Sequence, residues 1–393
     1  MRGNPSPPSD PSRAVRNSGE AFLRPRITRH GLRLALSVVI IRTLLGSAAV
    51  LAVGSVVLRQ PWPFVVESRS FLSFVSTEER QLEESSSRRM QAIAPAPEDL
   101  RVDASPTGLW QLRAIRAQEA WAALDLRWSG RTSERPRIRV GVYDGAMATA
   151  HPDLAQNLED DDPSEALATG FAWSLGLAHG VGMMGIIGGA GAPGMIGAAP
   201  RSIMIPFHTL RAGRDTSLPA ALSYFHAHAV RIANFAIAAA EPLGPAAAVR
   251  EAAEAGTLVV TGLPNRNAES LSYPAAYPGV VTASGVDNQD EPAGFGWGDL
   301  VDVVAPGWGM PTTAAVLRFG TLGWGAPYGH QCCNSVASAL TTGAAALILE
   351  SDPSLTSAQI EKRIKLSARK TAGMRDAHGR PVRWHPRFGY GVL

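Results

Sequence analysis

The hydrophobic pattern between residues 138 and 261 predicts strands separated by helices. Residues 138–144 alternate apolar and polar side chains, which is typical of a strand with one buried face. Strands that alternate with helices favour a parallel sheet, so the pattern indicates an α/β fold. Thr356 and Gln359 have the spacing of a capping box and predict a last helix. The other predicted elements are strands at 198–210, 230–240 and 257–261 and helices at 114–124, 178–189, 219–229 and 246–255.

A run of small and apolar residues at 341–349 predicts a buried helix. It carries no charge, and Asp352-Pro353 should end it, because proline cannot continue the backbone hydrogen bonds of a helix. Ser335 falls where this helix begins. A serine at that position either caps the helix by accepting a backbone N–H or serves as a nucleophile beside the positive end of the helix dipole.

The N-terminal quarter of the chain has a different pattern. Residues 1–31 are rich in Pro, Ser and Arg and are expected to be disordered. Residues 32–58 are apolar apart from Arg33 and Arg42. The uninterrupted part, 43–58, is shorter than the ~20 residues of a membrane-spanning helix, whereas 34–58 is long enough but contains Arg42. Residues 32–58 are interpreted as a signal anchor, a cleaved signal peptide or an internal core helix. Residues 59–104 are expected to form a linker or short pro-segment, and 105–393 the globular domain.

Charge is distributed unevenly along the chain. Residues 1–60 carry nine arginines, no lysine and two acidic residues, a net +7, whereas the whole chain has a formal charge of +3, so the remainder is −4. A slightly acidic body argues against a nucleic-acid partner. An arginine-rich flank before an apolar segment places the N-terminus in the cytoplasm and the rest outside. We therefore expect a membrane-anchored or secreted monomer with an extracytoplasmic domain.

Three polar residues, Asp144, His179 and Ser335, lie at the ends of predicted strands and helices, where functional groups of an α/β fold are commonly found. Asp144 ends a predicted strand, and ligands collect at the carboxyl ends of parallel strands, although an Asx-turn or helix cap would place an aspartate there too. His179 opens a glycine-punctuated helix, but a lone histidine is more often structural. Together with Ser335 they follow the chain order Asp, His, Ser, which occurs among the convergent serine-protease triads.

Residues from about 105 to 393 are similar to the catalytic domain of the subtilase family of serine peptidases. The resemblance implies a three-layer subtilisin-like α/β fold with a mostly parallel central sheet flanked by helices. It implies a polypeptide substrate. The motifs that carry it are Asp144 with His151-Pro152-Asp153-Leu154, the helix opened by His179-Gly180, the run Tyr273–Val280, the segment Asp302–Gly307 and the segment Asn334–Ser338.

The resemblance also implies a role for four residues. Ser335 would attack the scissile carbonyl, and His179 would take its proton and return it to the leaving amine. Asp144 would fix the imidazole tautomer and stabilise the imidazolium. Asn265 matches the amide that donates a hydrogen bond to the oxyanion, a contact worth about 2.7–4 kcal/mol in such enzymes.

Several positions depart from the family's pattern. The substrate-pairing strand reads Ala236-Ile237-Ala238 in place of Ser-Leu-Gly, which still allows backbone pairing with an extended peptide. Pro264 replaces the glycine before the oxyanion asparagine, and Gly182 stands where the His motif has a second histidine. Two functions are left open by these departures. They are an active serine endopeptidase and a catalytically weak or inactive peptide-binding domain on the same fold.

The cysteines and an acidic run have alternative interpretations. Cys332 and Cys333 are adjacent, so we expect no ordinary unstrained disulfide between them, and they are interpreted as small packing residues or, less favourably, as a redox pair. Cys333 and Asn334 replace the Gly-Thr that precedes the family's serine. Glu159 to Asp162 is either a Ca²⁺ site, as in many subtilases, or a solvated acidic turn, the interpretation that we favour. No other cofactor is expected.

Overall fold

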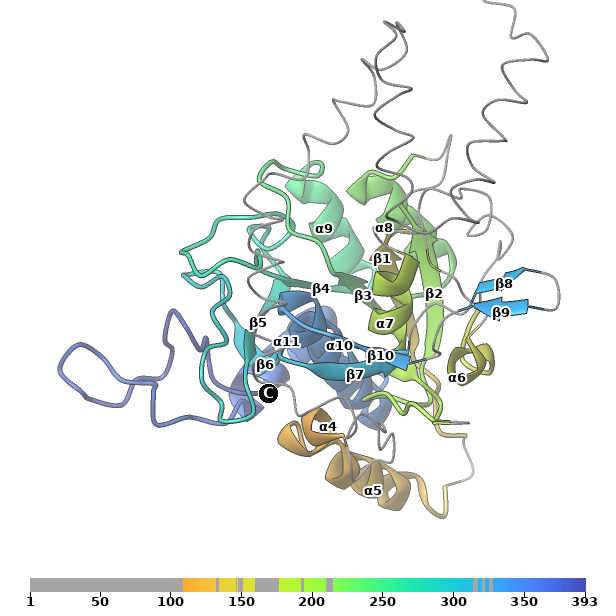
Figure 1. Cartoon of the computed structure of the whole chain (residues 1–393), viewed down its shortest axis with the longest axis horizontal. Helices are drawn as coiled ribbons and strands as arrows, with labels where there is room; N and C mark the ends of the chain where they lie inside the picture. The colour runs from red at the N-terminus through yellow and green to blue at the C-terminus, as the bar shows by residue number, and fades with distance from the viewer. Residues whose placement is uncertain are drawn as a thin grey trace, which may run out of the picture. The chain divides into compact units, whose positions relative to one another are not determined.

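Six parallel strands form the central sheet, in the order β2-β1-β3-β4-β5-β6 (Figure 1). The computed structural model describes residues 109–131, 134–145, 147, 151–159, 177–191, 194–209, 215–313, 317–319, 322–324 and 328–393. The strands of the sheet are β1 (Arg139–Asp144), β2 (Ile203–His208), β3 (Ile232–Phe235), β4 (Leu258–Gly262), β5 (Val280–Val286) and β6 (Val303–Pro306). The α/β class and the parallel sheet predicted from the sequence are confirmed.

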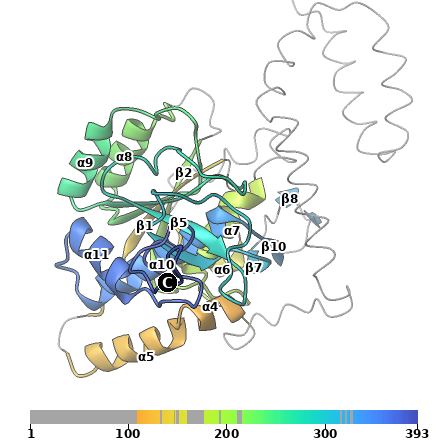
Figure 2. The ribbon, with the colours of Figure 1, turned by 90° about the vertical axis from the view of Figure 1, so that its left-hand side faces the viewer.

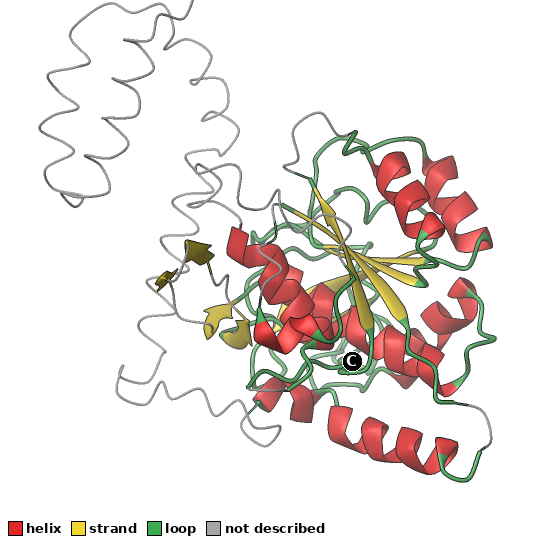
Figure 3. Cartoon of the chain, turned by 90° about the vertical axis from the view of Figure 1, so that its right-hand side faces the viewer, coloured by secondary structure: helices red, strands yellow, loops and turns green. Residues whose placement is uncertain are grey.

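Helices cover both faces of the sheet, which makes the fold three-layered (Figures 2 and 3). Helices α7 and α10 pack on one face, and α8 and α9 pack on the other. The helices are α4 (Trp110–Ala114), α5 (Ala117–Trp128), α6 (Pro152–Ala155), α7 (Leu177–Gly188), α8 (Leu218–Ala227), α9 (Ala246–Glu254), α10 (Asn334–Ser351) and α11 (Ser357–Ser367).

The alternation along β1 decides which face of the sheet Asp144 occupies. Successive side chains of a strand point to opposite faces. Val140 and Val142 belong to the hydrophobic core beneath α7 and α10, whereas Tyr143 belongs to the core beneath α8 and α9. Asp144 is two residues beyond Val142 and therefore shares its face. The carboxylate at the end of β1 is thus directed toward the helix that carries His179.

A β-ribbon leads the chain into α10. Strand β7 (Met310–Thr313) pairs antiparallel with β10 (Tyr328–Gln331), and β8 (Leu317–Phe319) pairs antiparallel with β9 (Leu322–Trp324). The hydroxyl groups of Thr312 and Thr313 each donate a 2.7 Å hydrogen bond to a backbone carbonyl of α7, those of Gly182 and Val181. Because β10 runs directly into α10, these bonds help to fix the start of α10 against α7.

The observed ends of the helices can be compared with those predicted from the sequence. Helix α10 ends at Ser351, immediately before the aspartate-proline pair, as predicted. The Thr356 and Gln359 capping box is present, because each side chain accepts the backbone N–H of the other residue. The helix predicted at 114–124 is instead divided between α4 and α5. Arg116, with a positive φ of 56°, separates them.

The predictions for residues 1–31, 32–58 and 59–104 lie outside the described residues, as does the first part of the 105–393 domain. Within the described ranges, no helix has both the length and the apolar composition needed to span a bilayer. The membrane-spanning or signal segment therefore stays a prediction from the sequence.

Candidate active site

The Asp144 carboxylate and the His179 imidazole meet at the C-terminal end of β1. Asp144 Oδ2 accepts a 2.7 Å hydrogen bond from His179 Nδ1, and Oδ1 accepts the Gly145 N–H at 2.7 Å. The Asp144 side chain is 7 % exposed and the imidazole 36 %. An ionised carboxylate can only accept, so Nδ1 carries the imidazole proton. Nε2 is then the basic nitrogen, on an imidazole that solvent and substrate can reach.

A close approach between α7 and β1 makes this contact possible. An ideal Cβ built on Gly180 would lie 2.9 Å from Asp144 Cβ and would also overlap the Met147 side chain. Only glycine fits at a backbone position so close to another chain segment. The glycine that follows His179 is therefore part of the geometry that places the imidazole on the carboxylate.

The environment of His179 favours its protonated form. Burial lowers the pKa of His179, but the Asp144 charge and hydrogen bond raise it, and the net direction is upward from the ordinary value of 6.5. The same carboxylate that fixes the tautomer therefore stabilises the imidazolium. A base that gains a proton during a reaction needs this stabilisation.

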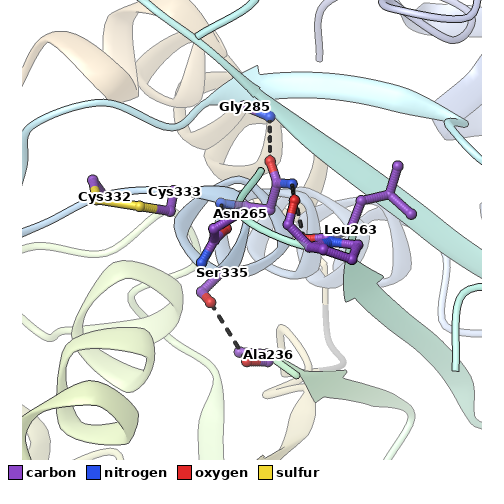
Figure 4. The surroundings of a disulfide bond; sticks show 9 residues. Ala236, Leu263, Asn265, Gly285, Cys332, Cys333 and Ser335 are labelled. Atoms are coloured by element: carbon purple, nitrogen blue, oxygen red, sulfur yellow. Dashed lines mark hydrogen bonds between the residues drawn. A yellow bond between two sulfur atoms is a disulfide. The ribbon is translucent and has the colours of Figure 1, made fainter. Parts of the chain in front are cut away.

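Ser335 is the second residue of α10 and does not cap it. The N-cap is Cys333, which makes no side-chain capping bond, so the N-cap interpretation of Ser335 is wrong. The Ser335 hydroxyl donates instead to the Ala236 carbonyl at 3.4 Å (Figure 4). No hydrogen bond between Ser335 and His179 is formed in the described part of the chain. The two residues come from helices that pack against each other.

Asn265 lies beside the start of α10. Its Oδ1 accepts the backbone N–H of Asn334 at 3.0 Å. This bond commits the oxygen end of the amide, so the NH₂ end is the donor that remains on an exposed side chain. The loop that carries Asn265 stays attached to the fold despite Pro264, because the Pro264 carbonyl accepts the Gly296 N–H at 3.0 Å. The structure thus brings Asn265 to the residue that precedes Ser335.

The segment Ala236-Ile237-Ala238 follows β3 and passes beside Ser335. The Ala236 carbonyl accepts the Ser335 hydroxyl, and the Thr261 hydroxyl donates to the Phe235 carbonyl at 2.8 Å and lies 3.1 Å from the Ile237 carbonyl. Ala238 is exposed. No described residue hydrogen-bonds its backbone N–H or C=O. These two groups are therefore open to an extended peptide.

Cys332 and Cys333 are joined by a disulfide (Figure 4). The expectation of unbonded packing residues is wrong, and neither cysteine is fully buried. Sequence reasoning excluded this bond on the geometry of an ordinary disulfide. The structure accommodates it with Cys333 at φ 85° and ψ −172°, a backbone conformation that is nearly restricted to glycine.

The conformation of Cys333 gives a stability prediction. We expect Cys332→Ser/Cys333→Gly to be more stable than Cys332→Ser/Cys333→Ala by about 1–3 kcal/mol, because alanine retains the Cβ that this conformation disfavours. Both variants lack the disulfide, so each controls for its loss. The measurement is urea unfolding of the two proteins. Equal unfolding free energies would show that residue 333 is not held in this conformation.

The space beside Gly182 of α7, where the family has a second histidine, is filled by a side chain from strand β10. An ideal Cβ on Gly182 would lie 2.6 Å from Cδ of Gln331, at the end of β10. The Gln331 carboxamide thus occupies the space that a larger side chain at 182 would need. Sequence reasoning missed Gln331, because it is far from Gly182 along the chain.

The calcium interpretation of residues 159–162 is only partly within the described chain. The Glu159 carboxylate is held by Arg139, with N···O distances of 2.8 and 2.5 Å. These bonds lower the pKa of Glu159. Across the described residues, no group of three or more His, Cys, Asp or Glu side chains could hold a metal ion. The three aspartates of the run lie outside those residues, and a Ca²⁺ site there stays untested.

Comparison with known sequences gives one consistent family. The model described as the subtilase family of peptidases matches residues 136–391 of the 393. Subtilisin BL of Lederbergia lenta is 28 % identical over 245 residues, which cover 59 % of this chain and 83 % of the relative. The alkaline protease of Alkalihalobacillus alcalophilus is 28 % identical over 245 residues, and the match spans 59 % of each protein's length.

Comparison with solved structures gives the same fold. Fervidolysin of Fervidobacterium pennivorans, a keratinolytic enzyme related to subtilisin, has a TM-score of 0.56 and 21 % identity, over 75 % of this chain and 46 % of that one. The MycP3 protease from the type VII (ESX-3) secretion system has a TM-score of 0.54 and 19 % identity, over 72 % of this chain and 85 % of that one. At these identities the likeness extends to the fold alone.

Proposed function

Because this chain belongs to the subtilase family of serine endopeptidases, we propose that Asp144, His179 and Ser335 form its catalytic triad and that it cleaves polypeptides outside the cytoplasm. The observation that carries the proposal is the 2.7 Å hydrogen bond between Asp144 Oδ2 and His179 Nδ1. The bond joins the first two residues of the Asp, His, Ser order. His179 lies on α7, which packs against α10, the helix that carries Ser335. The order and the contact together favour a triad over an isolated ion pair.

Catalysis follows from the atoms at this site. The Ser335 hydroxyl turns from Ala236 to His179, and its oxygen attacks the scissile carbonyl while Nε2 takes the proton. Asp144 stabilises the imidazolium, and the amide of Asn265 with the Ser335 N–H binds the oxyanion. Collapse expels the amine, which receives the proton from His179. Water then hydrolyses the acyl-enzyme by the same steps, with His179 again as the base.

A polypeptide substrate is expected to pair with residues 236–238. An extended peptide bound along an exposed segment gains main-chain hydrogen bonds, and the exposed backbone of Ala238 offers one donor and one acceptor. The Ala236 carbonyl is beside Ser335, so a peptide paired here would present its backbone to the nucleophile.

Covalent labelling of Ser335 tests the proposal. The full chain should react with a fluorophosphonate, and peptide mass spectrometry should find the label on Ser335. The same preparation should hydrolyse denatured casein, and labelling should abolish the hydrolysis. A folded sample that neither labels nor hydrolyses casein would remove the endopeptidase proposal.

The pH dependence of hydrolysis is a further prediction. His179 must be neutral to accept a proton, and its pKa lies above the ordinary value of 6.5. We therefore expect kcat/KM to rise with pH along an acid limb whose midpoint lies above 6.5. The measurement is kcat/KM from about pH 5 to about pH 10, with circular dichroism at each pH to verify folding. A midpoint at or below 6.5 would contradict the upward shift.

A catalytically weak peptide-binding domain is the second candidate. One observation favours it, which is that the Ser335 hydroxyl is bonded to Ala236 rather than to the imidazole. Catalytic hydrogen bonds often form only when substrate binds, so this contact does not decide between the candidates. Retention of a peptide by Ser335→Ala, without turnover by the parent protein, would favour the binding domain.

Two observations support the extracytoplasmic location. Residues 32–58 are apolar behind an arginine-rich flank, and a disulfide joins Cys332 and Cys333. Disulfides persist mainly in oxidising compartments outside the cytoplasm. Added protease should digest the C-terminal domain of intact cells, and a domain that resists digestion until the cells are broken would contradict this location.

A further inference from the structure

Asn334, the residue before the proposed nucleophile, has a hydrogen-bonded side chain at the junction of three segments. It is 1 % exposed. Its Oδ1 accepts the Gly285 N–H at 2.8 Å and lies 3.3 Å from the Ser284 hydroxyl, whose proton makes a shorter 2.8 Å bond to the Gly296 carbonyl. Its Nδ2 donates to the carbonyls of Leu263 at 2.8 Å and Pro264 at 3.1 Å. Both donors of the carboxamide are thus used, and its oxygen accepts a backbone N–H.

These bonds join the two proposed oxyanion donors. Leu263 and Pro264 lead directly into Asn265, whose amide is one donor, and Ser335, whose N–H is the other, follows Asn334 in the chain. The Asn334 N–H also holds Asn265 Oδ1 at 3.0 Å. Asn334 therefore hydrogen-bonds the Asn265 loop through both its side chain and its backbone. It is also bonded covalently to Ser335, whose N–H is the second donor.

The packing around Asn334 leaves little freedom for this junction to move. An ideal Cβ on Gly262 would lie 2.6 Å from the Asn334 carbonyl oxygen, so the end of β4 touches the first residue of α10. Threonine, which the family's motif has at this position, carries one hydroxyl and cannot make the three bonds that the carboxamide makes to Gly285, Leu263 and Pro264. The arrangement therefore depends on the asparagine of this chain.

We propose that Asn334 is a positioning residue for the reaction: its carboxamide sets the separation and direction of the Asn265 amide and the Ser335 N–H. The inference rests on the proposed function of Ser335. Asn334 acts on the transition state through Asn265 and Ser335 and does not itself contact the substrate. Its loss should therefore lower kcat more than it changes KM.

Asn334→Asp is the sharpest variant, because aspartate has the same shape. One carboxylate oxygen can still accept the Gly285 N–H, but the other would face the carbonyl oxygens of Leu263 and Pro264 and repel them. We expect kcat to fall about 100-fold to 1,000-fold, the loss typical of one missing oxyanion donor, with KM changed less than about threefold. The affinity of a peptide aldehyde, whose hemiacetal needs the same donors, should fall in parallel with kcat.

Asn334→Thr is the second variant and keeps the experiment decisive if the aspartate variant does not fold. Threonine is neutral and supplies one hydroxyl in place of the carboxamide, so it should fold. We expect its kcat to fall at least about tenfold with KM nearly unchanged. A parent-like kcat in this variant would overturn the proposal.

Asn234→Ala is the matched control for the loss of a buried asparagine. Asn234 is fully buried on β3 and donates to Ser338 Oγ at 3.3 Å and Thr342 Oγ1 at 2.9 Å, both on the same α10 helix. Its removal should lower the unfolding midpoint but leave kcat within about threefold of the parent. Asn334 variants that lose kcat only in proportion to this control would show a structural role alone.

The deciding experiment is a double-mutant cycle with Asn265→Ala. If Asn334 acts through Asn265, Asn334→Asp should lower kcat of the Asn265→Ala enzyme by about tenfold or less, against about 100-fold or more in the parent. Equal losses on both backgrounds would overturn the proposal. Fluorophosphonate labelling of the parent separates the two hypotheses, because an unlabelled parent refutes the proposed function, whereas a labelled parent with an unchanged Asn334 variant refutes only this inference.

Discussion

Ser335→Ala is expected to lower kcat/KM about 10⁶-fold and to abolish fluorophosphonate labelling. The reason is that no other group of the site can form the acyl-enzyme. The hydroxyl makes one hydrogen bond, to Ala236 at 3.4 Å, so its removal should leave the fold unchanged. The measurements are casein hydrolysis, labelling and the thermal unfolding midpoint of the full chain.

Ser338→Ala is the matched control for this variant. Ser338 lies one turn further along α10 and is fully buried, and its hydroxyl donates to the Ser335 carbonyl at 2.8 Å. We expect the Ser338→Ala protein to be less stable than the parent and still to take up the label. Persistent labelling of Ser335→Ala would mean that another residue is the nucleophile.

Asp144→Asn is expected to lower kcat about 10⁴-fold. The Asp144 carboxylate accepts the His179 Nδ1 proton at 2.7 Å and so leaves Nε2 basic. An asparagine amide can present its NH₂ group to Nδ1 instead, which places the imidazole proton on Nε2 and removes the base. The measurement is steady-state kinetics near the pH optimum, with unfolding by urea to verify the fold.

A second, half-buried carboxylate provides the control for Asp144→Asn. Asp302 Oδ1 forms a 2.8 Å ion pair with Lys365 Nζ, and Oδ2 accepts the Thr282 N–H at 2.9 Å. Asp302→Asn should lower stability and leave kcat within about tenfold of the parent. If Asp144→Asn lost no more activity than Asp302→Asn, Asp144 would not be part of a triad.

Much of the fold could be predicted because local patterns determine it. Residues 138–144 alternate strictly enough to give a strand, and the same period places Asp144 on the face that later receives α7. The capping box at Thr356 and the stop at Asp352 depend only on neighbouring residues, and both are confirmed. The division of the helix at 114–124 was missed because a positive φ at Arg116 leaves no clear signal in the sequence.

The contacts of the site could not be predicted from the same signals. The bond between Asp144 and His179 joins residues 35 apart, and the bond from Asn334 to Leu263 joins residues 71 apart. Such contacts depend on how helices and strands pack, which local propensity does not specify. The Cys332–Cys333 disulfide was missed for a different reason, because the rule for ordinary disulfides does not cover a cysteine in a glycine-like conformation.

The sequence by itself therefore determined the α/β class and the family, because each follows from periodicity or from motifs in a fixed order. Only the tertiary structure decided that the Asp144 carboxylate holds the imidazole, that Ser335 bonds to Ala236 and does not cap its helix, and that Asn334 joins the Asn265 loop to α10. These are directional hydrogen bonds between distant segments. Their geometry exists only after the sheet and the two helices above it have packed together.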